Sequence, residues 1–379
     1  MKQTAKIIGT LILAAMLGLT LLTAYQKPKT AEWTVGKPLG KDKIKIGILY
    51  VDDAEDGWSY AHRLGLKEMQ DKIGIADEQI ISRLKVIDTN GSIAAGTIRE
   101  LIYSGANVII ATSWGYMDAC ENLSREYPNV IFAHSSGHKN NDTNFTNYYG
   151  RDYQARYLSG IVAGLRTETD KIGYVAAMGR ENSEVTSGLD AFAMGVESVN
   201  PEAKVYVRVT HNWYDPAAER ESAQELIARD CDVIAQHVDT ANPQIEAGKA
   251  GVWSLGYNCD MAAAAPGAVI TSVVWNWGVY YSFLINSLID GTFNTQPYLG
   301  DLPGGLVSLA PINDSLAAPN TARAVKAAKE QILSGELNIF AGLIETNDGA
   351  RVGAPGAAMS GEEIIRNTHW YYRNIIELK

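Results

Sequence analysis

The chain of 379 residues is 46% hydrophobic and 20% charged, a composition typical of a globular protein long enough for two domains. It has 33 basic and 43 acidic residues and a net charge of −10. Because no basic stripe interrupts this acidic balance, nucleic acid and anionic lipid surfaces are excluded as partners.

The N-terminus has the pattern of a secretory signal over residues 1–24. Lys2 and Lys6 precede an apolar run of about 16 residues, 7–22, which is marginal for a membrane-spanning helix. The first acidic residue is Glu32. We therefore expect export to an extracytoplasmic location, and loss of the two lysines moves the net charge from −10 to −12.

The end of this signal lacks a lipid-attachment residue. Leu22-Thr23-Ala24 would complete a bacterial lipoprotein signal if cysteine followed, but the next residue is Tyr25. A lipid anchor is therefore not expected, and both cleavage after Ala24 and retention of an uncleaved signal stay open. Residues 25–43 contain Lys, Pro and Gly and predict a flexible tether.

Short apolar runs alternate with helical patterns along the rest of the chain. The predicted strands are 45–50, 84–88, 107–111, 130–134, 171–176, 204–210, 232–236, 252–256 and 269–274. The predicted helices are 58–73, 93–104, 116–126, 152–166, 184–198, 216–229, 243–249, 278–290 and 319–334. This alternation predicts an α/β protein with mostly parallel sheets covered on both faces.

An internal sequence repeat divides the chain into two similar halves. Lys45-Ile46-Gly47 recurs as Lys171-Ile172-Gly173, and Glu100-Leu101-Ile102 recurs as Glu225-Leu226-Ile227 at nearly the same offset. Two doubly wound lobes follow, with their strand C-termini facing a shared cleft. In this comparison Trp114 of the first lobe is the counterpart of Asp239 of the second.

Five of the eight tryptophans follow strand-like runs or end one: Trp58, Trp114, Trp213, Trp275 and Trp277. Loops after strand C-termini converge on the ligand crevice of an α/β protein, so rings at these places indicate a flat ligand. The alternative is that some of these rings pack under loops. We expect Trp277 to pack at the start of its helix.

The sequence carries no pattern of an enzyme. The G-x-S-x-G, H-E-x-x-H, Walker A and G-x-G-x-x-G motifs are absent. His62 and His237 are too scattered for a metal site, and no cofactor is expected. A metal-dependent nucleoside hydrolase would need clustered aspartates, for which the acidic loop 52–56 is the one candidate; a charged surface loop is the better interpretation.

Several segments resemble the basic membrane protein family of ABC-transporter substrate-binding lipoproteins, which includes purine nucleoside receptors. The segments are 47–62, 111–119, 149–158, 212–216, 256–261 and 274–278. The resemblance runs from about Lys43 to the C-terminus. It implies a type I periplasmic-binding-protein fold, with three hinge crossings near residues 148–150, 272–276 and 308–311. The N-terminal lobe would comprise 44–148 plus 276–308, and the C-terminal lobe 149–272 plus 311–379.

The resemblance also implies the ligand site. An aromatic ring from each lobe sandwiches the base in the family's purine receptors, and Trp58 and Trp213 match these rings. Asp260 matches an aspartate that holds polar atoms of the ligand. The full set of candidate ligand-binding residues is Trp58, Ser59, Trp114, Asn212, Trp213, Asp239, Asp260 and Trp275.

One departure from the family pattern concerns the sugar. Nucleoside-binding members have a lysine after a strand like Ser272-Val273-Val274, whereas this chain has Trp275. An indole offers one donor and cannot replace an ammonium that bonds a diol. The sequence therefore predicts a monomeric receptor for a free nucleobase, such as adenine or hypoxanthine, that serves an ABC permease. A purine nucleoside receptor and a ligand sensor for a membrane signalling protein stay as alternatives.

Overall fold

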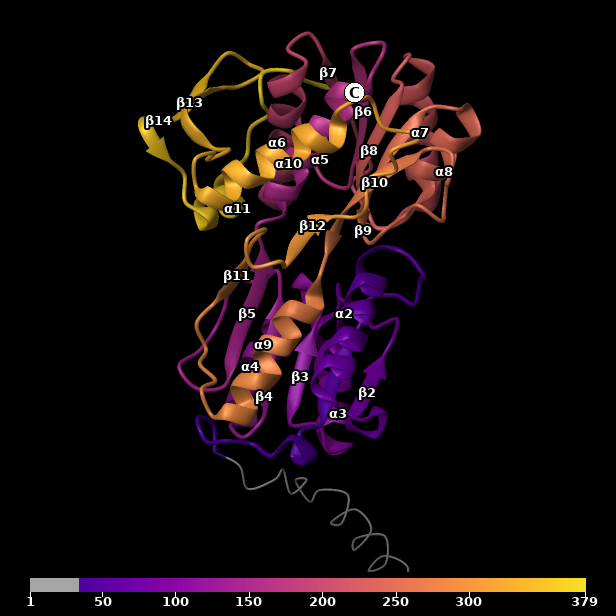
Figure 1. Ribbon diagram of the computed structural model, residues 1–379. Helices are drawn as coiled ribbons and strands as arrows, with labels where there is room; N and C mark the ends of the chain where they lie inside the picture. Colours follow the sequence, from indigo (N-terminus) through magenta and orange to yellow (C-terminus); the bar gives the residue numbers. More distant parts are fainter. Residues whose placement is uncertain (1–33) are drawn as a thin grey trace, which may run out of the picture.

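The computed structural model describes residues 34–379 and shows two α/β lobes, each built around its own sheet (Figure 1). The predicted signal over 1–24 and the first part of the predicted tether, residues 25–33, lie outside the described residues. The end of that tether is packed rather than free: Leu39 is buried and its N–H donates to the carbonyl oxygen of Leu288. The tether prediction was therefore wrong for these residues, because Leu39 joins the apolar core.

The first sheet has the strand order β11-β5-β4-β3-β1-β2, with every pair parallel. Its strands are β1 (Ile46–Leu49), β2 (Ile80–Arg83), β3 (Val108–Ala111), β4 (Ile131–Ser135), β5 (Phe145–Gly150) and β11 (Tyr298–Gly300). Its helices are α2 (Gly57–Ile73), α3 (Gly91–Tyr103), α4 (Met117–Glu126) and α9 (Trp277–Asp290). Helices α2 and α9 pack on one face, and α3 and α4 cover the other, so both faces of the strands are apolar.

The second sheet has the order β12-β10-β9-β8-β6-β7-β15. Its strands are β6 (Lys171–Ala176), β7 (Lys204–Val209), β8 (Val233–His237), β9 (Trp253–Asn258), β10 (Val269–Trp275), β12 (Val307–Leu309) and β15 (Ile375–Glu377). Its helices are α5 (Asp152–Arg166), α6 (Ser183–Val199), α7 (Pro216–Ala228), α8 (Asn242–Ala250), α10 (Thr321–Ser334) and α11 (Gly361–Asn367). A hairpin of β13 (Ala341–Glu345) and β14 (Arg351–Ala358) completes this lobe, and short 3-10 turns lie at Lys41–Lys43, Asp77–Gln79 and Trp114–Tyr116.

The strand orders confirm the two doubly wound lobes predicted from the internal sequence repeat. Strands β2-β1-β3-β4-β5 of the first sheet correspond in order to β7-β6-β8-β9-β10 of the second. The repeated Lys-Ile-Gly segments lie at the start of β1 and β6, and the repeated Glu-Leu-Ile segments lie in α3 and α7. In such sheets ligands bind beyond the carboxyl ends of the strands, and here those ends face the other lobe.

The second strand was predicted at residues 84–88, and this placement was wrong. Strand β2 ends at Arg83, Lys85 has a positive φ of 57°, and Leu84 and Ile87 are exposed. A left-handed residue cannot continue a strand, so this apolar run forms a surface loop. The sequence analysis also missed β5 and all strands after β10, because these are short or rich in polar residues and glycine.

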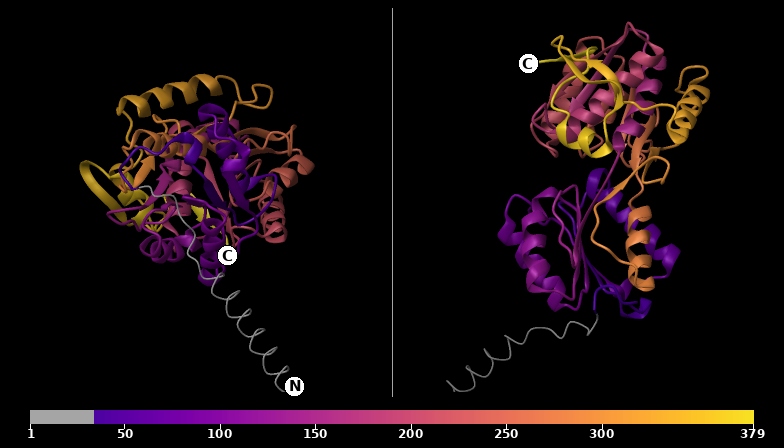
Figure 2. Two further views of the ribbon diagram at one scale, coloured as in Figure 1. Left: turned by 90° about the horizontal axis from the view of Figure 1, so that it is seen from below. Right: turned by 90° about the vertical axis from the view of Figure 1, so that its left-hand side faces the viewer.

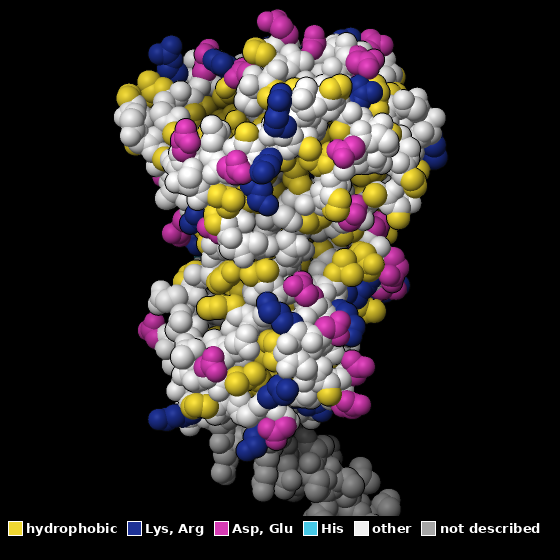
Figure 3. Space-filling view, in the orientation of Figure 1, with side chains coloured by type: hydrophobic (Ala, Val, Ile, Leu, Met, Phe, Trp, Pro, Cys, Tyr) yellow, Lys and Arg dark blue, Asp and Glu magenta, His cyan; other side chains and the backbone are white. Residues whose placement is uncertain are grey.

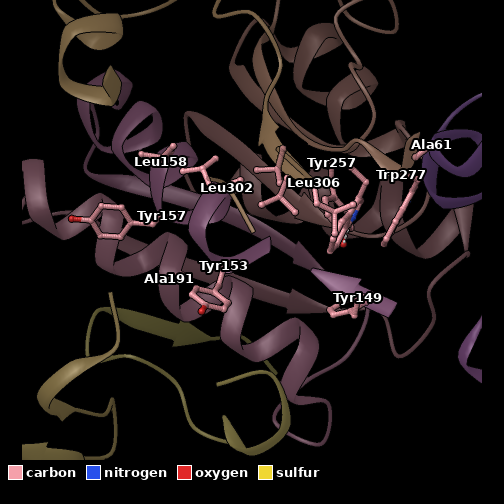
Figure 4. Packing of buried hydrophobic residues seen from close by; sticks show 14 of the residues in the cluster. Ala61, Tyr149, Tyr153, Tyr157, Leu158, Ala191, Tyr257, Trp277, Leu302 and Leu306 are labelled. Carbon is pink, nitrogen blue, oxygen red and sulfur yellow. Dashed lines mark hydrogen bonds between the residues drawn. The ribbon is translucent and has the colours of Figure 1, made fainter. Parts of the chain in front are cut away.

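The chain passes between the lobes three times: after β5, after β10, and between β11 and β12 (Figures 1 and 2). The third passage lies before β12, earlier than the predicted 308–311, because β12 pairs with β10 in the second sheet. One buried apolar cluster continues through these passages from Ala61 of α2 to Tyr153 of α5 (Figure 4). The hinge is therefore a packed region rather than three bare linkers.

Within residues 34–379, no helix is both long enough and apolar enough to cross a bilayer.

Candidate functional site

Trp58 lies in the first turn of α2, directly after the loop that follows β1. Its indole N–H donates to the carbonyl oxygen of Thr112 over 2.6 Å, which ties the ring to the end of β3. The ring meets His62, Trp277 and Trp275 edge-on, at centroid distances of 4.6, 5.3 and 6.0 Å. One hydrogen bond and three ring contacts therefore fix its orientation.

The rings of Trp275 and Trp277 form the centre of the hinge. They stack on each other at 4.6 Å, and Trp277 stacks in turn on His62 at 4.4 Å. Trp277 is fully buried in the first turn of α9, as expected from the sequence. Trp275 is only 4% exposed and packs over Tyr149 and against Gly150, where the chain makes its first passage.

A line of aromatic contacts continues from the hinge into the second lobe. The indole N–H of Trp275 donates to the hydroxyl oxygen of Tyr257 over 3.1 Å. The Tyr257 ring meets His237 edge-on at 4.5 Å, and His237 meets Trp213 at 5.8 Å. A line of rings, joined by these contacts and this one hydrogen bond, thus connects Trp58 of the first lobe to Trp213 of the second.

The backbone of the two lobes meets beside this line. Gly57 has a positive φ of 74°, and any side chain there would overlap the carbonyl oxygen of Asp239. The N–H of Asp239 donates to the carbonyl oxygen of Trp213 over 2.9 Å. Since Gly57 precedes Trp58, this contact brings both predicted sandwich residues to the same junction.

Asp56 forms a second contact across the junction. Its Oδ2 accepts a hydrogen bond of 2.9 Å from the N–H of Ala241, at the N-terminus of α8 in the other lobe. The side chain of Asp56 makes no capping bond to its own helix, α2. A carboxylate at a helix N-terminus accepts a hydrogen bond from an N–H that has no partner within the helix, and its negative charge interacts favourably with the positive end of the helix dipole. This bond therefore stabilises the contact between the two lobes. Burial raises the pKa of Asp56.

Polar side chains of the second lobe lie at the same place. Asp239 follows β8, and its Oδ1 accepts a hydrogen bond of 3.0 Å from Nδ2 of Asn258 at the end of β9. Burial raises the pKa of Asp239 well above its ordinary value, and the bond from Asn258 opposes this rise. Asn258 has a positive φ of 71°, which turns the chain away from the strand at this residue.

Glu184, in the first turn of α6, adds another carboxyl. Its Oε1 accepts a hydrogen bond of 2.5 Å from the hydroxyl of Tyr149, and burial raises its pKa to about 7. In α5, Asp152 and Arg156 form a buried ion pair at 3.6 Å. Burial raises the pKa of Asp152 to about 6. The Arg156 guanidinium lies 3.8 Å from the ring centroid of Tyr257.

Of the predicted ligand-binding residues, Trp58, Trp213, Asp239 and Trp275 come together around this junction. The hydroxyl of buried Ser59 instead braces the loop before it, donating to Oδ2 of Asp52 over 2.8 Å. Asn212 is exposed and accepts a hydrogen bond from the N–H of Tyr214 in its own loop. Trp114 follows β3 but is 54% exposed, with His138 as its ring neighbour.

Asp260 lies on the hinge side of the lobes. It is exposed, and its Oδ1 accepts a hydrogen bond from the N–H of Ala262. It lines a hollow of ≈ 330 Å³ together with residues of α2, of the second passage, and of β12 and the two residues after it. Asn258, two residues earlier, shares this hollow and is the residue that reaches Asp239.

Asn258, Glu184 and Tyr149 also lie at the junction and were not among the residues predicted from the sequence. A signal existed for two of them: Asn258 ends a strand, and Glu184 opens the helix that follows β6. Within residues 34–379, no group of three or more His, Cys, Asp or Glu side chains is placed to hold a metal ion. The three cysteines are buried free thiols. In the view of Figure 3, acidic and basic side chains are scattered over both lobes without a basic patch.

The two doubly wound lobes and the three passages between them define the fold class, that of the type I periplasmic-binding proteins. A solved structure supports this, an ABC transporter solute-binding protein from Conexibacter woesei. It is 20% identical, aligns with a TM-score of 0.64, and the match covers 78% of this chain and 97% of that one.

Residues 43–334 match the family described as Bmp, ABC transporter substrate-binding protein PnrA-like, and the chain belongs to this family. A purine-binding protein of Brucella abortus is 32% identical over 316 residues, covering 83% of this chain and 88% of its own. A putative ABC transporter glucose-binding protein of Haloferax volcanii is 32% identical over 312 residues, covering 81% and 76%.

Proposed function

We propose that this substrate-binding protein receives a free planar purine nucleobase between its lobes, as an extracytoplasmic monomer, and presents it to an ABC permease. The observation that carries this proposal is the line of rings from Trp58 to Trp213, which ends in one large flat side chain on each lobe. A base that stacks on both rings gains on the order of 1–3 kcal/mol from each. The relative from Brucella is named as purine-binding, which agrees with this ligand class.

The second support concerns the sugar. The single indole donor of Trp275 is already bonded to Tyr257, and the ring is packed among Tyr149, Trp277 and Trp58. It therefore offers no hydrogen bond to a ribose diol, and a sugar beside it would find apolar surface instead. These contacts favour a base over its nucleoside.

The two contacts between the lobes indicate how the lobes would close around a ligand. Asp56 caps α8 of the other lobe, and Gly57 lies against Asp239, so both contacts form only when the lobes are together. A ligand that touches both rings favours this closed state by its differential contacts. The closed form is the one that a permease would distinguish from the open form.

Calorimetric titration of the mature protein with adenine, hypoxanthine and their nucleosides tests the ligand. Glucose belongs in the panel because the relative from Haloferax is named as glucose-binding. We expect a base to bind more tightly than its nucleoside, and glucose not to bind. Nucleosides that bind at least as tightly as bases would contradict the argument from Trp275, and binding of glucose alone would refute the purine proposal.

Export and anchoring are tested separately. We propose that residues 1–24 direct secretion and that Tyr25 leaves the protein without a lipid anchor. Fractionation and intact-mass measurement of the protein expressed in a bacterial host would check this. An added diacylglyceryl mass, or retention in the cytoplasm, would contradict it.

A further inference from the structure

The helix that carries Trp58 packs on the hinge with one side. Trp58, His62 and Gly65 follow one another at steps of four and three residues along α2, so they share a face of the helix. A side chain at Gly65 would overlap Trp277, so α2 and α9 lie in direct contact there. His62 therefore lies between the ring of the proposed ligand wall and the place where the two helices touch.

His62 extends the stack of hinge rings into α2. The planes of Trp275 and Trp277 differ by 9° and those of Trp277 and His62 by 12°, so these three rings are nearly parallel. Trp58 meets the stack edge-on, and His62 is the nearest of the three, at 4.6 Å and 82°. The hydrogen bond to Thr112 holds the indole N–H of Trp58, and the contact with His62 sets the angle of its ring.

The imidazole of His62 is fully buried and neutral. Burial lowers its pKa well below 6.5, and a neutral imidazole has one donor and one acceptor nitrogen. Nδ1 lies 2.6 Å from the hydroxyl oxygen of Tyr281 in α9, while Nε2 has no hydrogen-bond partner within residues 34–379. Among the described residues, Tyr281 therefore fixes the rotation of the ring on its polar side.

Tyr281 is in turn held inside the first lobe. It is fully buried, and its hydroxyl oxygen lies 3.3 Å from that of Tyr148 in β5. The Tyr148 ring stacks on Tyr280 at 4.0 Å, two residues before the end of the strand from which the chain first leaves the lobe. A line of polar contacts thus runs from the first passage through Tyr281 to His62, on the side of His62 away from the ligand cleft.

We propose, resting on the purine function above, that His62 is a positioning residue: its ring, held by Tyr281, sets the angle at which Trp58 faces a stacked base. Because His62 is fully buried, it acts through Trp58 and not by contact with the ligand. Aromatic stacking depends on the angle between the ring planes, and a wall fixed at the correct angle loses less entropy on binding.

A double-mutant cycle tests the link between His62 and Tyr281. His62→Phe keeps a flat ring without nitrogen atoms, and Tyr281→Phe keeps its ring without the hydroxyl. Affinity is measured by titration with adenine and hypoxanthine. Each variant is expected to lower it by ~10-fold, and the double variant by about the same factor rather than ~100-fold, because both changes remove one bond.

Tyr103→Phe is the matched control. It removes the hydroxyl of an exposed tyrosine of α3, which lies 3.3 Å from the hydroxyl of Tyr127, and should leave affinity unchanged. Thermal unfolding identifies a variant that fails to fold. Tyr281→Phe loses only one oxygen atom, so it decides the test by itself where His62→Phe is unfolded.

The indole N–H resonance of Trp58 gives a second readout that needs no ligand. In isotope-labelled protein it is assigned with Trp58→Phe. We expect the resonance to move in Tyr281→Phe, which keeps the rings around Trp58, and to stay in place in Tyr103→Phe. A change in overall stability without rotation of the ring would not move it.

The outcomes separate the two proposals. Losses of affinity that multiply in the double variant, unchanged affinity in both single variants, or an unmoved Trp58 resonance in Tyr281→Phe would each overturn the positioning role and leave the purine function standing. If no base binds the wild-type protein, the purine function fails, and the resonance alone decides whether His62 and Tyr281 set the ring.

Discussion

Trp58 and Trp213 stand at the two ends of the same line of rings, but their surroundings differ. Trp58 is held in a helix by a hydrogen bond to Thr112 and by three aromatic neighbours. Trp213 lies in the loop after β7, with His237 as its ring contact and exposed residues on either side. In the proposed site, the first lobe would offer a wall that is fixed before the ligand arrives, whereas the wall of the second lobe would depend on its loop and on closure. Such preorganisation lowers the entropic cost of binding on one side.

Replacing Trp58, the fixed wall of the proposed site, should lower ligand affinity the most. Trp58→Ala removes a stacking surface and leaves a cavity beside Trp275 and Trp277, so affinity for the base should fall by ~100-fold or more. The free energy of unfolding should also fall, by about 3 kcal/mol, because Trp58 supports the hinge rings. Titration and chemical denaturation measure the two effects. An unchanged stability would contradict the fixed-wall interpretation.

Replacing Trp213, the wall on the loop of the second lobe, should lower ligand affinity with little change in the free energy of unfolding. Trp213→Ala loses one stacking face, and affinity should fall by ~10-fold to 100-fold while stability changes by less than ~1 kcal/mol. Tyr214→Ala is the control, because the neighbouring ring is 50% exposed and no ring contact ties it to the line. If the control lowers affinity equally, the loop as a whole rather than Trp213 carries the contact.

The contact between lobes should have an intermediate effect. Asp56→Ala removes the cap that the first lobe gives to α8, worth about 0.5–2 kcal/mol, so affinity should fall by ~2-fold to 30-fold with a larger open population. Asp56→Asn keeps an acceptor oxygen and should lose less. Small-angle scattering without and with ligand measures the radius of gyration. Identical closure in the alanine variant would show that this bond does not select the closed state.

The last prediction concerns the dependence of stability on pH. The pKa of Glu184 is about 7 in the folded protein, against its ordinary 4.5, because the side chain is buried. The folded state therefore holds this proton where the unfolded chain has released it, so stability falls as pH rises from about 4.5 to 7. Asp152 and Asp239 act in the same direction.

Glu184→Gln should flatten part of this decline. Thermal unfolding without ligand, measured across that pH range for the variant and the wild-type protein, checks the expectation. A slope as steep as that of the wild-type protein would show that the pKa of Glu184 is not raised.

Sequence patterns were sufficient to predict the two-lobed architecture but not every strand. The regular alternation of strand and helix and the repeated segments in β1 and β6 predicted two lobes of the same order, because parallel strands buried on both faces need continuous apolar runs. Strand β5 is rich in polar residues, and the short strands β11 and β12 pair with β5 and β10, which lie far away in the chain, so none of the three carries such a run. The run at 84–88 failed for the opposite reason, because a left-handed Lys85 turns apolar side chains to the surface.

The candidate site, like the fold, was predicted from the sequence only in part. The sequence by itself determined that large rings follow the strands, and it named Trp58, Trp213, Trp275 and Asp239, because strand ends always gather at one edge of a sheet. Only the tertiary structure decided which polar groups meet there. Asn258 and Asp260 are two residues apart, but the left-handed backbone at Asn258 directs one to Asp239 and leaves the other on the hinge surface. The direction of a side chain depends on such local geometry and on partners from distant segments, as Tyr149 and Glu184 also show.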